Sequence, residues 1–175
     1  YQGTTWEGVD VAVKVQRPGL IRQVSLDMYC LRLFLMALRA FWGGGTVDLR
    51  PIADEVGGGV FVEMDYMIEA NNADEFRRRH AFLGFVTTPK WLPDMSTSRV
   101  LTMEFVKGRK VSQLGTEESL SMVQMAVECS VAQLLQTGLV HADPHEGNLI
   151  FTDDGQLCYL DFGLVTDVEP RHMEA

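Results

Sequence analysis

The alternation of apolar and polar residues divides the first half of this chain into strands and helices. Small apolar and polar residues alternate over residues 9–16, which predicts a strand, and residues 1–5 are expected to form its antiparallel neighbour. Apolar residues then recur at every third or fourth position across residues 20–42, which predicts one amphipathic to fully buried helix. Two further helices are expected, over residues 48–55 and 61–79.

The second half of the chain continues with strands, a helix and a hairpin. Strands are predicted over residues 86–91 and 100–105. The polar run at residues 116–118 is expected to cap a helix over residues 119–136, which Gly138 ends. Farther on, two short apolar runs flank the turn sequence Asp153-Asp154-Gly155, which predicts a β-hairpin over residues 149–160.

Two polar motifs flank this hairpin and carry the strongest chemical signal. The run HADPHEGN (residues 141–148) precedes it, and Asp161-Phe162-Gly163 follows it. Phosphoryl transfer from ATP needs a carboxylate beside the acceptor and oxygen ligands for Mg²⁺. In the order found in kinases, Asp143 would supply the catalytic carboxylate, and Asn148 and Asp161 would supply the metal ligands. Because a hairpin returns the chain to its starting end, these two metal ligands are expected to lie together.

The strand over residues 9–16 carries a matching lysine. Lys14 lies between small apolar neighbours in the run VAVKV, a pattern typical of the kinase strand whose lysine reaches the ATP phosphates. Its neighbour Ala12 is expected to pack against the adenine. A carboxylate on the helix over residues 61–79 must hold this lysine, and Glu63, Asp65 and Glu69 are the candidates. A solvated acidic helix face is the ordinary alternative for these three residues.

A strand-to-loop segment is the candidate hinge for the adenine. The strand over residues 100–105 is expected to leave the small lobe at Met103, and the backbone from Glu104 to Val106 would then meet the adenine edge. A plain buried strand followed by a turn explains this segment equally well.

A zinc site is a rival interpretation of the HADPHEGN run. His141, Asp143 and His145 alternate, so in an extended segment they would face one way and bind a metal. Pro144 and Gly147 disfavour a regular strand, and no fourth ligand suggests itself. The kinase interpretation is therefore preferred.

Composition and charge narrow the class of protein. The net charge of −9 argues against a nucleic-acid-binding surface, and the basic run at residues 77–80 is expected to be a solvated patch. The three cysteines are far apart and lack zinc spacing, so we expect them to be reduced and packed.

The apolar stretch over residues 31–42 is interrupted by Arg32 and Arg39 and is shorter than the ~20 residues of a membrane span, so no transmembrane helix is predicted. With 175 residues, the chain is shorter than the roughly 250 of a complete two-lobed kinase, which indicates a fragment.

Together these motifs resemble the UbiB/ADCK-like (aarF-domain) family of atypical kinases. The resemblance rests on VAVKVQRPG at residues 11–19, LTMEFVKG at 101–108, HADPHEGN at 141–148 and LDFG at 160–163. It implies an α+β, protein-kinase-like two-lobed fold that is truncated at both ends. Residues 1–105 would form part of the small lobe, with a family-type helical insert at about 20–59, and residues 106–175 would begin the large lobe. Glu146 stands where the family usually has Pro.

The resemblance also implies site residues and a biological setting. Glu69 would pair with Lys14, whereas Glu63 and Asp65 would face a family-specific KxGQ segment outside this sequence. The expected cofactors are ATP and Mg²⁺, and the expected activity is that of an atypical kinase or ATPase in isoprenoid-quinone or prenyl-lipid metabolism. Its partners would include lipids or quinone-biosynthesis proteins, with membrane association possible, in a plastid or mitochondrion, or in the cytoplasm or at the membrane of a bacterium.

Two alternative functions remain open from the sequence alone. A small-molecule phosphotransferase of the aminoglycoside-kinase type shares the HxDxxxxN pattern, but the VQRPG turn and the long helical insert disfavour it. A non-catalytic nucleotide-binding module is the other alternative, and the intact set of Lys14, Asp143, Asn148 and Asp161 disfavours it.

Overall fold

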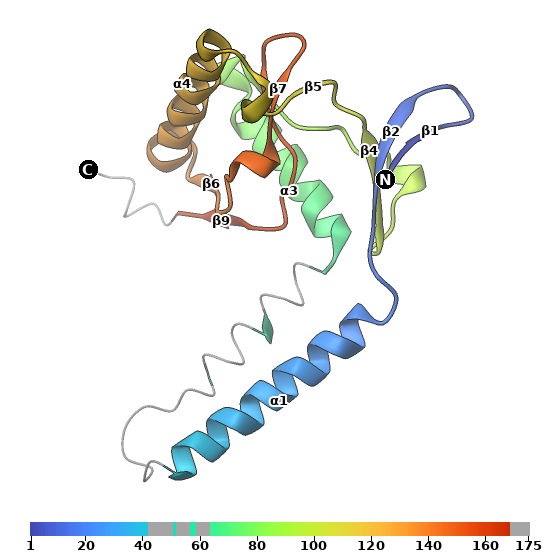
Figure 1. Ribbon diagram of the computed structural model, residues 1–175, viewed down its shortest axis with the longest axis vertical. Helices are drawn as coiled ribbons and strands as arrows, with labels where there is room; N and C mark the ends of the chain where they lie inside the picture. Colours follow the sequence, from blue (N-terminus) through green and yellow to red (C-terminus); the bar gives the residue numbers. More distant parts are fainter. Residues whose placement is uncertain (42–50, 52–56, 59–63, 169–175) are drawn as a thin grey trace.

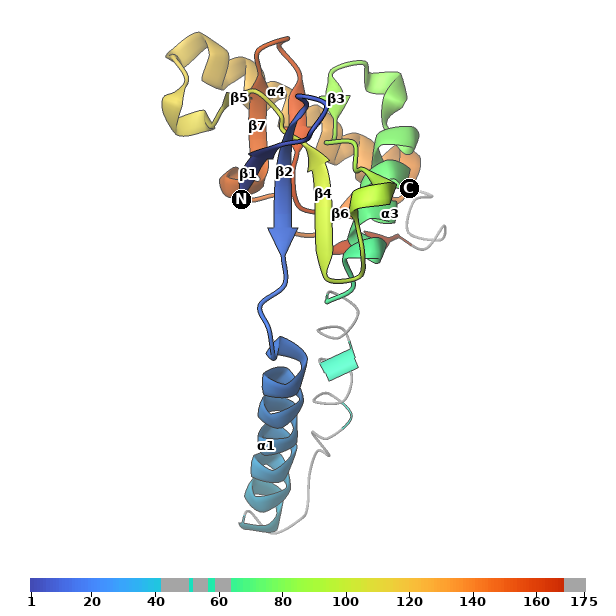
Figure 2. The ribbon, with the colours of Figure 1, turned by 90° about the vertical axis from the view of Figure 1, so that its right-hand side faces the viewer.

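A three-stranded antiparallel sheet forms the part of the fold that begins the chain. The computed structural model describes residues 1–41, 51, 57–58 and 64–168. The sheet has the order β1-β2-β4 (Figure 2). Its register places Ala12 opposite Met103 and Lys14 opposite Leu101. The predicted strands are confirmed, with the bounds β1 (Gln2–Thr4), β2 (Asp10–Val15) and β4 (Val100–Glu104).

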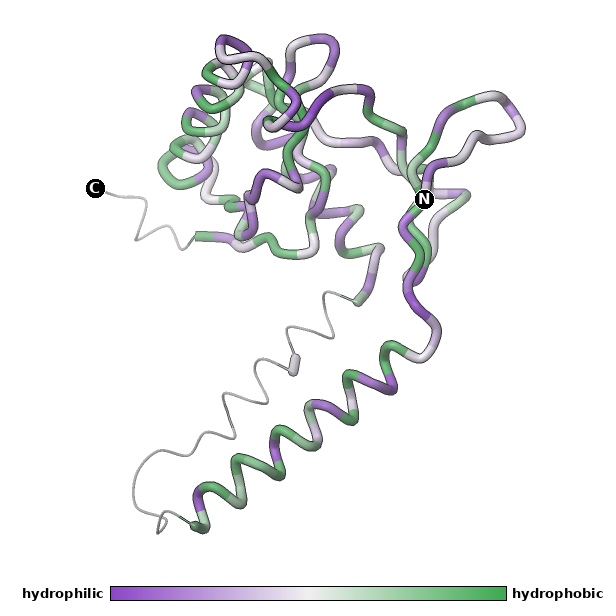
Figure 3. Tube along the Cα trace, viewed as in Figure 1, coloured by the Kyte–Doolittle hydropathy of each residue, from purple (hydrophilic) through white to green (hydrophobic). Residues whose placement is uncertain are grey.

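The helix α1 (Leu20–Phe41) follows β2 and extends away from the two sheets (Figure 1). The predicted helix is therefore confirmed up to residue 41, but its predicted burial is wrong, because α1 buries none of its residues. Apolar side chains along it, such as Leu26, Tyr29 and Phe34, are exposed, and Figure 3 shows green residues along its whole length. No helix within the described ranges combines the length and the hydropathy needed to cross a bilayer.

The helix α3 (Tyr66–Arg79) begins later than the apolar pattern suggested. Asp65 is extended, with φ −96° and ψ 102°, and its carboxylate accepts the N–H of Met67 at 3.0 Å, so it caps the helix and fixes the start at Tyr66. The predicted helix over residues 48–55 falls mostly outside the described residues, and so does Glu63.

A second sheet and the helix α4 form the other half of the fold. The sheet has the order β3-β8-β7-β5, in which β7 and β8 make the predicted hairpin, and β6 pairs with β9 beyond it. The bounds are β3 (Val86–Thr87), β5 (Gly108–Arg109), β6 (Leu139–His141), β7 (Leu149–Thr152), β8 (Leu157–Tyr159) and β9 (Val165–Asp167). Short 3-10 turns occupy Ala81–Leu83, Pro93–Met95, Val111–Gln113 and Glu146–Asn148.

Two predicted elements of this half have different bounds in the structure. The strand expected over residues 86–91 is only two residues long, because the chain leaves β8 and reaches β4, where Trp91 makes an isolated bridge to Met103. The helix α4 (Thr116–Ala132) starts three residues early, because the Glu118 carboxylate accepts the N–H of Gly115 and caps it there. A π-helical turn (Gln133–Thr137) then leads to Gly138, the predicted stop.

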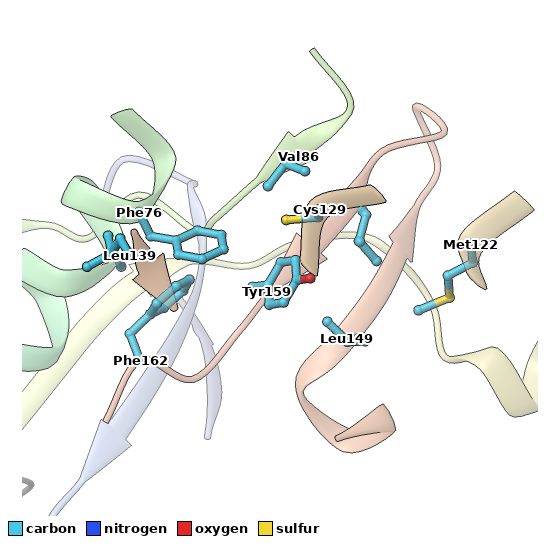
Figure 4. Packing of buried hydrophobic residues seen from close by; sticks show 10 residues of the cluster. Phe76, Val86, Met122, Cys129, Leu139, Leu149, Tyr159 and Phe162 are labelled. Carbon is cyan, nitrogen blue, oxygen red and sulfur yellow. The ribbon is translucent and has the colours of Figure 1, made fainter. Parts of the chain in front are cut away.

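The core lies where α3, α4 and the hairpin meet (Figure 4). The Phe76 ring centroid is 5.1 Å from that of Tyr159 and 5.2 Å from that of Phe162, so α3 is packed directly onto the segment that follows the hairpin. Cys129 and Cys158 are buried as predicted, and this burial raises the pKa of the Cys158 thiol to about 12. The exposed Cys30 on α1 contradicts the prediction that all three cysteines are packed.

The predicted division of the chain at residue 105 stays a prediction. The packing of Phe76 and Val86 with Leu157 and Tyr159 joins the segment before residue 105 to the hairpin that follows it. The basic run at residues 77–80 is not a purely solvated patch, because its last residue, His80, is fully buried.

Candidate active site

Three charged residues from distant parts of the chain meet between β2, α3 and the end of the hairpin. The Nζ of Lys14 lies 2.8 Å from both carboxylate oxygens of Glu69 and 3.3 Å from Oδ1 of Asp161. Glu69 is only 4% exposed, whereas Lys14 and Asp161 are 37% and 43% exposed. Of the three candidate partners for Lys14, Glu69 therefore makes the contact, and Asp65 instead caps α3.

The balance of charge in this cluster sets the protonation of its members. Burial would lower the pKa of the Lys14 ammonium, but Glu69 and Asp161 outweigh it and raise that pKa above its ordinary value. Burial disfavours the Glu69 carboxylate and raises its pKa in spite of Lys14. Burial acts the same way on Asp161, yet Lys14 and the N–H of Gly163 hold its pKa below the usual range. Asp161 is thus the carboxylate that stays ionised most readily.

Tyr66 is a fourth member of the cluster that the sequence analysis missed. The Lys14 Nζ lies 5.2 Å from the centroid of its ring, within the range of a cation–π contact. Tyr66 precedes Glu69 by three residues, so both lie on the same face of α3. That spacing was visible in the sequence, but the position of Lys14 above it was not.

His141 joins the HADPHEGN loop to the segment that carries Asp161. Its Nε2–H donates to the backbone oxygen of Asp161, and its Nδ1 accepts the N–H of Asp143 at 3.3 Å. Burial lowers the pKa of this histidine, which keeps it neutral and preserves both bonds. Asn72 on α3 adds a further anchor, because its Nδ2 donates to the Phe162 carbonyl at 3.1 Å.

Asp143 and Asn148 lie on the short connection between β6 and β7, whereas Asp161 follows β8. The Asn148 carbonyl accepts the N–H of Leu160 at 2.9 Å, which brings Asn148 beside the residue that precedes Asp161. Its Nδ2 donates to the Asp143 carbonyl at 3.3 Å. The side chains of Asp143 and Asp161 are 51% and 43% exposed, so a ligand can reach both.

A pocket of about 370 Å³ opens between the first sheet and the hairpin. Ala12 and Met103 line it from β2 and β4, Ile150 and Leu160 line it from the hairpin side, and the segment from Glu104 to Val106 closes one edge. Lys14 follows Ala12 by two residues on the same face of β2. All four predicted nucleotide-contacting residues other than Lys14 therefore surround a single pocket.

The donor set fits Mg²⁺ better than zinc. Asp161 and Asn148 offer carboxylate and amide oxygens, which Mg²⁺ prefers. The zinc alternative at residues 141–145 loses its first ligand, because both ring nitrogens of His141 are engaged in hydrogen bonds. Within residues 1–41, 51, 57–58 and 64–168, no three His, Cys, Asp or Glu side chains are grouped to hold a metal ion by themselves. A Mg²⁺ ion held by Asp161 and Asn148 would take its remaining oxygen ligands from phosphates and water.

The family model and the similar proteins point to the same family. The model of the ABC1 atypical kinase-like domain matches residues 1–175. An uncharacterised aarF domain-containing protein kinase of the Arabidopsis thaliana chloroplast is 44% identical over 164 residues, covering 94% of this chain and 23% of that protein. The chloroplast protein ACTIVITY OF BC1 COMPLEX KINASE 3 of the same plant is 39% identical over 167 residues, covering 93% of this chain and 24% of that protein.

A cyanobacterial relative and a solved structure extend the comparison. An uncharacterised Synechocystis protein is 39% identical over 175 residues, covering 97% of this chain and 26% of that protein. The chain thus spans about a quarter of the length of these curated relatives. The structure of Mycobacterium tuberculosis Rv3197 with erythromycin has a TM-score of 0.80 at 24% identity, covering 95% of this chain and 42% of that one. This likeness shows the fold, and it agrees with the predicted α+β kinase-like architecture.

Proposed function

Because the chain belongs to the family of ABC1 atypical kinase-like domains, we propose that the protein binds ATP with Mg²⁺ and acts as an atypical kinase or ATPase. The observation that carries the proposal is the pairing of Lys14 with Glu69 and Asp161 at one side of an apolar pocket. A lysine held by a helix carboxylate, next to the aspartate of a DFG segment, is the arrangement that protein kinases use to hold ATP phosphates. Because the relatives are about four times longer, the proposal concerns the full-length protein.

The pocket suits an adenine ring. Ala12 and Met103 would cover one face of the ring, and Ile150 and Leu160 the other. The N–H groups of Glu104 and Phe105 are already bonded, to the carbonyls of Lys90 and Asp10. The N–H of Val106 has no hydrogen-bond partner in the described part of the chain. It can therefore donate to a ring nitrogen, while the Glu104 carbonyl can accept from the exocyclic amine.

Each charged or polar residue of the site would have its own role at the phosphates. Lys14 would contact the α- and β-phosphates, and Glu69 would keep its ammonium in place. Asp161 and Asn148 would hold Mg²⁺, which supplies charge neutralisation at the phosphates when it is bound. Asp143 would orient the attacking hydroxyl or water and accept its proton.

We assign the biological setting from the relatives and the UbiB resemblance. The named relatives are chloroplast or cyanobacterial proteins, which favours a plastid or a cyanobacterial cell for this protein. Support of isoprenoid-quinone or prenyl-lipid metabolism is the role that the resemblance favours. A test is to delete the gene and measure the quinone pool, then to complement with the wild type and with Asp143→Asn. If both proteins restored the quinone pool equally, the role in quinone metabolism would not depend on catalysis.

Family membership leaves the aminoglycoside-kinase alternative without support. The non-catalytic binding module is distinguished from the proposed enzyme by experiment. Binding of Mg-ATP to the full-length protein is measured by calorimetry, beside steady-state phosphate release. We expect Lys14→Met to lose most of the binding and all measurable turnover, whereas Lys90→Met, which changes an exposed lysine outside the cluster, should match the wild type. Equal Mg-ATP affinity in Lys14→Met and wild type would contradict the proposed site, and binding without turnover in the wild type would favour the module.

A further inference from the structure

His145 is the residue of the HADPHEGN loop that the proposed function leaves without a role. Its Nδ1 accepts the backbone N–H of Gly147 at 3.0 Å, so the ring caps the 3-10 turn Glu146–Asn148. Its Nε2 lies 3.7 Å from Oδ2 of Asp143. The same ring therefore faces a backbone donor on one side and the proposed catalytic carboxylate on the other.

The backbone bond determines where the ring proton lies. An imidazole nitrogen that accepts a hydrogen bond carries no proton, and a neutral imidazole then carries its proton on the other nitrogen. With Nδ1 accepting from Gly147, the proton of His145 is on Nε2. The Nε2–H is thus the remaining donor of the ring, and Nε2 lies 3.7 Å from Oδ2 of Asp143.

The loop holds the ring in this position. A Cβ atom at residue 147 would lie 2.6 Å from Cε1 and 2.8 Å from Nδ1 of His145, so only glycine leaves room for the ring here. The His145 carbonyl accepts the N–H of Asn148 at 2.9 Å, and the Asn148 side chain donates to the Asp143 carbonyl at 3.3 Å. His145 is therefore connected to both ends of the segment that carries Asp143 and Asn148.

We propose that His145 is a positioning residue that orients the Asp143 carboxylate through its Nε2–H. The inference rests on the proposed catalytic role of Asp143. The Asp143 side chain is half exposed, and among the described residues His145 is the only lysine, arginine or histidine side chain within 4 Å of its carboxylate. Without the imidazole, the carboxylate has more orientations to visit, and misplacing a reacting group by about 1 Å costs up to about 10²-fold in rate.

Two substitutions of His145 test the contact with Gly147 and the contact with Asp143 separately. His145→Asn keeps an acceptor where Nδ1 lies, so it preserves the bond to Gly147, but it is too short to reach Asp143. His145→Gln is longer, and its amide N–H can restore a donor to the carboxylate. In the full-length protein we expect His145→Asn to lower kcat about tenfold with the KM for ATP unchanged, and His145→Gln to recover part of that loss. Gly147→Ala, which displaces the ring without changing it, should lower kcat in the same way.

A second measurement does not depend on turnover. Histidine ¹⁵N shifts at pH 8 in selectively labelled protein should show the Nε2–H form for His145, identified as the signal absent from His145→Asn. The Nδ1–H form would overturn the proposal whatever the activity. Unchanged kcat in His145→Asn, or a loss that His145→Gln does not reduce at all, would also overturn it, provided that Asp143→Asn abolishes turnover. If Asp143→Asn itself retains full turnover, the proposed function fails and the positioning role fails with it.

Discussion

The Lys14 ammonium lies 2.8 Å from each carboxylate oxygen of Glu69, although 55 residues separate the two in the chain. Its third contact, Oδ1 of Asp161 at 3.3 Å, lies 147 residues away. One cation thus lies between two carboxylates that come from α3 and from the segment after the hairpin. Removing it leaves two like charges beside each other, one of them on the almost fully buried Glu69.

Lys14→Met should make the stability of the fold depend on pH. Burial already raises the pKa of Glu69, and loss of the lysine raises it further. A carboxyl whose pKa is raised on folding stabilises the folded state at low pH, and this contribution is lost as pH rises from its ordinary value of 4.5 through the folded value. The urea midpoint of Lys14→Met should therefore fall further below that of the wild type at pH 7.5 than at pH 5.

The control for this prediction is the double variant Lys14→Met/Glu69→Gln. Its glutamine cannot ionise, so its midpoint relative to the wild type should vary much less between pH 5 and pH 7.5. An equal pH dependence in the single and double variants would show that Glu69 is not the titrating group.

Tyr66→Leu should lower the kcat/KM for ATP more than Tyr66→Phe does. The ring contact with the Lys14 ammonium is electrostatic, and phenylalanine keeps the ring face whereas leucine removes it. An exposed cation–π contact contributes about 0.5–1 kcal/mol, which corresponds to a change of roughly twofold to fivefold in kcat/KM. Steady-state phosphate release at several ATP concentrations measures the effect. A Tyr66→Phe variant as impaired as Tyr66→Leu would indicate that the hydroxyl, rather than the ring, matters.

Asp161→Asn should abolish the dependence of nucleotide binding on Mg²⁺. Its carboxylate is the charged half of the proposed metal pair, and its lowered pKa keeps it ionised at neutral pH. The affinity of an ATP analogue is measured with Mg²⁺ and with EDTA. Asp154→Asn, an exposed residue of the hairpin turn, serves as a matched control and should behave like the wild type. An equal, metal-independent affinity in wild type and Asp161→Asn would refute the metal role.

Asp143→Asn should abolish ATP turnover while it leaves ATP binding largely intact. The carboxylate is placed to act on the attacking group, so its contribution belongs to the transition state. General bases contribute about 10²–10⁴-fold in rate, which is measurable above background. Phosphate release and equilibrium binding are compared for the two proteins. A large loss of binding would instead make Asp143 a structural residue or a metal ligand.

Several features of the fold could be predicted from the sequence because they depend on neighbouring residues. The hairpin β7–β8 follows from the Asp-Asp-Gly turn between two apolar runs, and β2 follows from its alternation. The hairpin was also sufficient to predict that Asn148 and Asp161 lie close together, and the Asn148 carbonyl does accept the N–H of Leu160, the residue before Asp161. The end of the π-helical turn after α4, at Gly138, is equally local.

Other features depended on what packs against each element, and the apolar pattern along the sequence does not reveal that. The apolar pattern of residues 20–42 predicted burial, yet α1 extends away from both sheets, and Cys30 is exposed on it. His80, at the end of a run of arginines, is buried because its ring packs at 4.2 Å from Phe76 and bonds to Thr137. Thr137 lies 57 residues from His80 in the sequence, and the exposure of α1 likewise depends on what packs against the helix rather than on its own apolar pattern.

The site divides in the same way. The sequence by itself determined which residue types are available, namely a strand lysine, helix carboxylates and an HxDxxxxN loop before DFG. The residues alone left three candidate partners for Lys14, and the resemblance pointed to Glu69. The tertiary structure decided that Glu69 makes the contact, that Tyr66 lies beside the Lys14 ammonium and that His145 lies near Asp143. The physical reason is that caps and turns close bonds between residues a few positions apart, whereas an ion pair across 55 residues exists only after β2 and α3 have been brought together by the packing of the sheet and the core.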